Sequence, residues 1–126
     1  MKKNLLKILD QSLSGLHAII TFAPYVLMIS FLTLAIAARL SLGHWPVVYR
    51  DNFQNGAIPV LESITILIAA LVFVSPVVWV ITGTILIQPG KREALKSRAI
   101  IYLLGLVVLL ALNWSDPTGF FEWFWD

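Results

Sequence analysis

Three long apolar runs divide the chain, and short polar segments separate them. They cover residues 16–38, 58–87 and 99–114. After Glu62 in the middle run, the next charged residue is Lys91. A helix needs roughly 20 mostly apolar residues to cross a hydrocarbon layer about 30 Å thick. The third run is short, but Lys96 and Arg98 before it can extend their charges to the headgroups. We therefore predict an all-α membrane protein with three transmembrane helices.

Residues 1–15 have a different pattern, in which leucines alternate with lysines and other polar residues. Leu5, Leu9, Leu13 and Leu16 recur at helical spacing, which predicts a short N-terminal amphipathic helix. A basic amphipathic helix beside a span usually lies in the headgroup plane. The alternative is that this segment simply extends the first span. Because the following run has 23 residues, longer than a signal-peptide core, we expect it to be retained.

Helix-breaking residues set the connections between the runs. Pro24 is expected to kink the first span, Pro59 to occupy the first turn of the second helix, and Gln88-Pro89-Gly90 to end it. The sequence thus predicts one integral membrane domain with an outer loop at 39–57, a basic turn and helix start at 88–98, and an aromatic outer tail at 115–126. The turn at Pro89 is so short that the second and third helices must be antiparallel neighbours.

The charges of the chain indicate which side each connection faces. Seven basic residues share one side, namely Lys2, Lys3, Lys7, Lys91, Arg92, Lys96 and Arg98, whereas only Arg39 and Arg50 lie on the other. Basic residues concentrate in cytoplasmic loops. We therefore expect a cytoplasmic N-terminus and an outer C-terminus. The net charge of +2 is weak evidence for nucleic-acid binding, and we expect none.

A few polar residues on the outer side are candidates for chemistry. They form a possible outer-face cluster of Arg39, His44, Arg50, Asp51 and Glu62. Glu62 stands out, because a carboxylate within a span is costly unless it is paired. Arg39, His44 or Arg50 are possible partners, and the alternative is that Glu62 lies at headgroup depth near a helix N-terminus. One His with scattered acids lacks metal-ligand spacing, so we expect no metal and no cofactor.

The basic turn and His17 are the candidates on the other side. Lys91, Arg92, Lys96 and Arg98 are possible contacts for anionic lipid headgroups, although the same residues serve as an ordinary topology signal. His17 begins the first span, where an ionisable group is either functional or within reach of water.

Aromatic residues gather at the outer side, and they are possible anchors at the membrane interface. The candidates are Trp45, Tyr49, Trp114, Trp123 and Trp125. The tail from Phe120 to Asp126 has five aromatics in seven residues. It either anchors in the outer interface, docks on a partner protein or covers a lipid or quinone-like ligand.

The loop after the first span resembles a known pattern. The residues Ala38-Arg39-Leu40-Ser41-Leu42-Gly43-His44-Trp45-Pro46, followed by Tyr49 and Asp51, look like a loop found in a family of small uncharacterised bacterial three-helix membrane proteins. That family usually has a proline soon after the acidic residue, whereas this chain has Asn52-Phe53-Gln54. The resemblance implies a bacterial inner membrane and implies no activity.

Three functions remain open. The first is an accessory or structural subunit that packs on partner membrane helices, because the spans hold almost no charge of the kind a pump needs along its path. The second is a homo-oligomeric transporter or channel lined by Ser63, Thr65, Ser75, Thr82 and Thr84. The third is a membrane enzyme acting on lipid or envelope substrate through His44, Asp51 and Glu62. Expected partners are the lipid bilayer and other membrane subunits or further copies of the chain.

Overall fold

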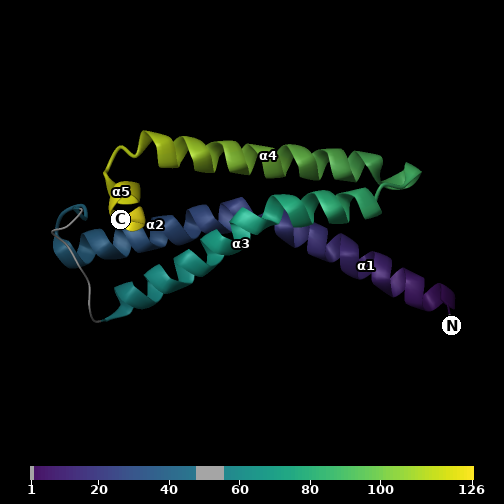
Figure 1. Ribbon diagram of the computed structural model, residues 1–126, viewed down its shortest axis with the longest axis horizontal. Helices are drawn as coiled ribbons and strands as arrows, with labels where there is room; N and C mark the ends of the chain where they lie inside the picture. Colours follow the sequence, from purple (N-terminus) through teal and green to yellow (C-terminus); the bar gives the residue numbers. More distant parts are fainter. Residues whose placement is uncertain (1, 48–55) are drawn as a thin grey trace.

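The computed structural model describes residues 2–47 and 56–126, and its regular structure over these residues is entirely helical. The elements in order are α1 (Lys2–Thr21), α2 (Ala23–Leu42), α3 (Ala57–Ile85), the short 3-10 turn η1 (Pro89–Lys91), α4 (Arg92–Ser115) and α5 (Phe120–Trp125). Figure 1 shows an elongated bundle with the two termini at opposite ends. We call the end with η1 and the start of α4 the basic end, and the end with Trp45 and α5 the aromatic end.

Three of these segments are long and apolar enough to cross a membrane. They are α2 with 20 residues, α3 with 29, and η1 with α4 over Pro89–Ser115 with 27. The predicted all-α membrane fold with three spanning helices and an additional N-terminal helix is therefore confirmed. The tight connection at η1 places α3 and α4 antiparallel, as Figure 1 shows.

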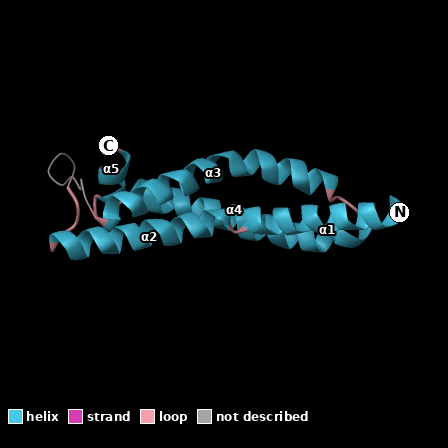
Figure 2. Ribbon diagram, turned by 90° about the horizontal axis from the view of Figure 1, so that it is seen from below, coloured by secondary structure: helices cyan, strands magenta, loops and turns pink. Residues whose placement is uncertain are grey.

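The first two helices meet at Phe22, seven residues after Gly15, where the N-terminal helix was expected to end. Pro24 lies in the first turn of α2, where its missing N–H leaves no helical bond unmade. Phe22 keeps helical angles of φ −93° and ψ −2°, and its N–H donates to the Ile19 carbonyl at 3.1 Å. The chain therefore changes direction without a loop. Figure 2 shows α1 and α2 following one another along the long axis.

The longest helix, α3, continues through Pro76 and bends near its middle (Figure 1). A proline inside a helix removes one backbone hydrogen bond and commonly produces such a bend. The helix ends at Ile85, two residues before the expected Ile87, and the Leu86 N–H is shared between the Thr82 and Gly83 carbonyls, at 3.1 Å each.

The core lies towards the aromatic end, where α2 packs against α3 and the tail. Leu27, Phe31 and Leu34 of α2 are buried there with Ala69 and Val72 of α3. Two tail residues, Phe120 and Phe124, complete the cluster. The tail that the sequence left as an aromatic segment is therefore a helix folded back on its own chain.

The turn before α5 explains how the tail reaches the core. Gly119 has φ +70°, a left-handed conformation that glycine adopts without strain. The Asp116 carboxylate accepts a hydrogen bond from the Glu122 N–H at 2.9 Å, and so satisfies a donor at the start of α5. Phe31 receives Phe124 edge-on, with ring centroids 4.9 Å apart at 90°, a preferred aromatic geometry.

Candidate functional site

A stripe of polar residues on α1 organises the basic end of the bundle. Asp10, Ser14, His17 and Thr21 are spaced by four, three and four residues, so they share one face of the helix. This polar face contacts η1, α3 and α4. Most leucines and isoleucines of α1 are exposed, and Ile19 is 72% exposed. α1 therefore turns this polar stripe to the protein, and most of its apolar side chains, with Lys3 and Lys7, to the surroundings.

Charged side chains hold the N-terminal half of this stripe. Lys91 Nζ donates to both carboxylate oxygens of Asp10, at 2.6 Å from Oδ1. Arg98 donates to the Ser14 carbonyl at 3.2 Å and approaches the Ser14 hydroxyl at 3.4 Å. Both contacts join residues more than 80 positions apart in the chain, so α1 is held by the start of the third span.

His17 lies at the centre of the junction and is fully buried. Its Nδ1 is 3.4 Å from an Arg98 guanidinium nitrogen. Because arginine only donates, Nδ1 is the acceptor and the proton of the neutral ring is assigned to Nε2. Nε2 is buried and has no hydrogen-bond partner among the described residues. It faces Gly83, where a Cβ would lie 3.2 Å from it.

The surroundings of His17 favour its neutral form. α1 precedes the first span, and burial at its junction with the bundle, followed by the charge of Arg98, lowers the pKa of His17. Both causes act in the same direction, because each penalises the imidazolium. At neutral pH this group is therefore an uncharged ring packed between helices.

Two aromatic rings continue the polar contacts into the bundle. The Trp79 indole packs 4.7 Å from the His17 ring and donates to the Thr21 hydroxyl at 3.1 Å. The same indole stacks on Tyr102, with planes 3° apart. The Tyr102 hydroxyl is 2.6 Å from Ser75 Oγ, which itself donates to a backbone carbonyl of α3. We call His17, Thr21, Trp79, Arg98 and Tyr102 the polar junction.

The structure describes only some residues of the outer-face cluster predicted from sequence. Arg50 and Asp51 lie outside the described residues, as does Tyr49. Arg39 places its guanidinium 4.6 Å from the centre of the Trp45 ring, and His44 Nδ1 is 2.7 Å from the Trp45 carbonyl. Within residues 2–47 and 56–126, Arg39 and Glu62 form no ion pair, and Glu62 is half-buried at the start of α3.

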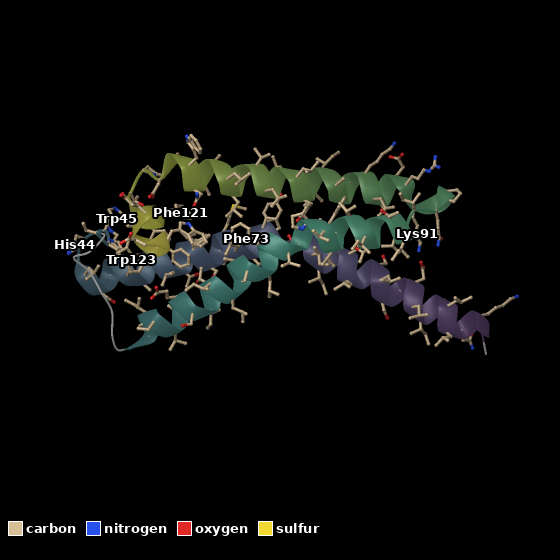
Figure 3. The ribbon with its side chains drawn as sticks, viewed as in Figure 1. His44, Trp45, Phe73, Lys91, Phe121 and Trp123 are labelled. Atoms are coloured by element: carbon tan, nitrogen blue, oxygen red, sulfur yellow. The ribbon has the colours of Figure 1, made fainter. Side chains whose placement is uncertain are left out.

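The predicted aromatic anchors divide into two kinds. Trp114 is 93% exposed and Trp125 is 51% exposed, with its indole N–H donating to Asn113 at 2.9 Å. Trp45 and Trp123 pack against the core cluster instead. Figure 3 shows Trp45, Phe121 and Trp123 gathered at the aromatic end. Two of the four tryptophans predicted as anchors therefore have an internal packing role that the sequence did not predict.

The four predicted lipid contacts also divide into two kinds. Lys91 and Arg98 are engaged with α1, and Figure 3 shows Lys91 at the opposite end from His44. Arg92 and Lys96 are exposed, and Lys96 pairs with Glu93 one turn earlier at 2.9 Å.

Among the described residues, no group of three or more His, Asp or Glu side chains lies close enough together to hold a metal ion.

The hydroxyl residues proposed to line a path on α3 do not share a face. Ser63 and Thr84 are exposed and donate to carbonyls of their own helix. Thr65 is buried at 2.7 Å from Ser30 of α2, and Ser75 meets Tyr102 of α4. These hydroxyls join helices or satisfy their own backbone, and do not form a continuous polar stripe.

Sequence reasoning recognised His17 and Arg98 separately but missed their contact with each other and with Trp79 and Tyr102. The available signal was the spacing of the polar residues on α1, which is as regular as that of the leucines. Compared with protein-family models, curated proteins and solved structures, the chain matches none. The resemblance of the Trp45 loop to small bacterial membrane proteins therefore stays a prediction.

Proposed function

We propose that the protein is an accessory or structural subunit of a bacterial inner membrane, which packs against the helices of a partner membrane protein. The observation that carries this proposal is the outward face of α4. Over an apolar stretch of 18 residues in this span, 11% of the residues are buried within the chain, compared with 28% in α2 and 22% in α3. α4 is therefore the span with the most surface left for other contacts.

The exposed residues of α4 have the spacing of a helix-packing seam. Ile100, Leu103, Val107, Leu110 and Trp114 follow one another at intervals of three and four, and all are exposed. This is the pattern by which apolar residues of one helix meet a second helix. The interior supports the same function, because its described polar groups join helices and provide no row of charges for transport.

The proposed orientation places the basic end in the cytoplasm. It follows from the seven basic residues of the N-terminal helix and of the segment from Lys91 to Arg98. Because the chain has no cysteine, single cysteines at Thr118 and Ser97 report the two ends directly. A membrane-impermeant maleimide should label Thr118→Cys in intact spheroplasts and Ser97→Cys only after lysis. The reverse pattern would overturn the orientation.

Photo-crosslinking in native membranes tests the subunit proposal. A photoreactive phenylalanine analogue at Leu103 or Leu110 should give a discrete adduct with a second protein, identified by mass spectrometry. The same analogue at Ile19, exposed on α1, is the matched control for nonspecific capture. A chain that crosslinks at Leu110 only to lipid and remains monomeric in native nanodiscs would refute the proposal. A homo-oligomer that conducts ions in liposomes would refute it in favour of the channel.

A further inference from the structure

A groove between α3 and α4 opens at the basic end, and one residue of the polar junction, Trp79, contributes to its lining. Its volume is about 530 Å³, within the range of small-ligand sites. Trp79, Val80, Gly83 and Ile87 line it from the α3 side, and Leu95 and Ala99 line it from α4. The groove between the two helices is therefore mainly apolar, and it continues into the spanning part of the bundle.

Two basic side chains from the start of α4 contribute to this groove. Arg92 and Lys96 line it, and their spacing of four residues places them on one face of α4. Arg92 is exposed and forms no ion pair with the described residues, whereas Lys96 has only the exposed partner Glu93. An exposed pair of this kind contributes little stability, so both cations remain available to an external anion.

The neighbouring basic residues are not available in the same way. Lys91 is held by Asp10, and Arg98 by Ser14 and His17. The structure thus separates the four basic residues of this segment into two that fix α1 and two that border an apolar groove. From Arg92 to Ala99 the groove runs about 10 Å along α4, from the charged start of the helix to its uncharged part.

We propose that this groove binds an anionic phospholipid, with one acyl chain along the apolar walls and the phosphate against Arg92 and Lys96. On α4 the lining passes from Arg92 and Lys96 in the first two turns to the uncharged Ala99, as a lipid passes from charged headgroup to hydrocarbon. Basic pockets between spanning helices are known to suit anionic headgroups. This site does not depend on the accessory role proposed above.

Native mass spectrometry of the full-length protein in a neutral detergent, titrated with phosphatidylglycerol or phosphatidylcholine, tests the headgroup contact. The wild type should retain phosphatidylglycerol preferentially. Arg92→Gln and Lys96→Gln should each weaken its binding about fivefold, the effect of one surface charge, and Glu93→Gln should strengthen it. Lys7→Gln, which replaces an exposed lysine on α1, is the control, because it changes the net charge by the same amount. Equal weakening by Lys7→Gln would show general attraction and overturn the site.

A second pair of variants tests the apolar walls without changing charge. Val80→Trp should fill the groove and reduce phosphatidylglycerol binding. Val77→Trp, at an equally exposed position on α3 that does not line the groove, should leave binding unchanged. Thermal unfolding of each variant verifies that it is folded. If Val80→Trp binds lipid as the wild type does, the groove proposal is wrong even when Arg92→Gln weakens binding.

Discussion

Gly105 lies at a close contact between α4 and α2, and its replacement by alanine gives the sharpest test of the packing described here. A Cβ at this position would lie 2.7 Å from Cε2 of Tyr25, 3.0 Å from Cζ of the same ring and 3.1 Å from Cβ of Pro24. Ordinary contact begins at 3.4 Å, so the ring must retreat by about 0.7 Å (3.4 minus 2.7). The Tyr25 hydroxyl donates to the Ile101 carbonyl at 2.7 Å, and this movement disrupts that bond.

The magnitude follows from three contributions. Overpacking a close helix contact costs about 1–3 kcal/mol, and loss of the tyrosine hydrogen bond costs about 1 kcal/mol. Replacing glycine by alanine inside a helix stabilises the helix by about 1 kcal/mol, which offsets part of this cost. Gly105→Ala should therefore lower the free energy of unfolding by about 1–3 kcal/mol, from the sum of these contributions.

The assay is reversible unfolding in mixed micelles, monitored by circular dichroism. Gly15→Ala is the matched control, because Gly15 lies within α1 and a Cβ there meets nothing within 4 Å; this variant should be more stable by about 1 kcal/mol. Combining Gly105→Ala with Tyr25→Ala should remove most of the cost. If Gly105→Ala stabilises the protein as Gly15→Ala does, α2 and α4 do not approach each other as described.

Three further predictions concern the ends of the bundle. Asp10→Asn should destabilise the protein by about 0.3–1 kcal/mol, because its ion pair is partly exposed, and exchanging the charges of Asp10 and Lys91 should restore stability; no recovery would contradict the pairing. Stability measured by thermal unfolding should be maintained above the ordinary histidine pKa of 6.5 and lost as the pH falls below it, because the unfolded chain then takes up a proton that buried His17 resists. His17→Gln should remove this dependence of stability on pH, and His44→Gln should preserve it. If His17→Gln leaves the dependence unchanged, a group other than His17 causes it. Phe124→Ala should cost about 3 kcal/mol and expose the tail to proteolysis, and unchanged digestion would show that α5 is not docked.

The spanning helices were predictable because membrane insertion depends on local composition. An uninterrupted apolar stretch must form a helix in a bilayer, since its backbone groups have no other partners. The end of the second span was equally local, because Pro89 and Gly90 stop a helix wherever they occur. Boundaries that depend on one proline were less certain, and Pro24 shifted the expected boundary from Gly15 to Phe22.

The site was harder to predict, because its contacts join distant parts of the sequence. Nothing near His17 in the sequence indicates that Arg98 lies beside it, or that Trp79 contacts both His17 and Tyr102. The tail shows the same limit. Its aromatic composition suits a lipid interface, a partner or its own core, and only the position of Phe31 decides among them.

The polar face of α1 has a consequence for the order of assembly during synthesis. Thr21 meets a residue 58 positions later, and Asp10 and Ser14 meet residues 81 and 84 positions later. These partners leave the ribosome only when most of the chain has been made. The segment that is translated first therefore waits for its partners, and until then its aspartate and serine must be hydrated at the membrane surface.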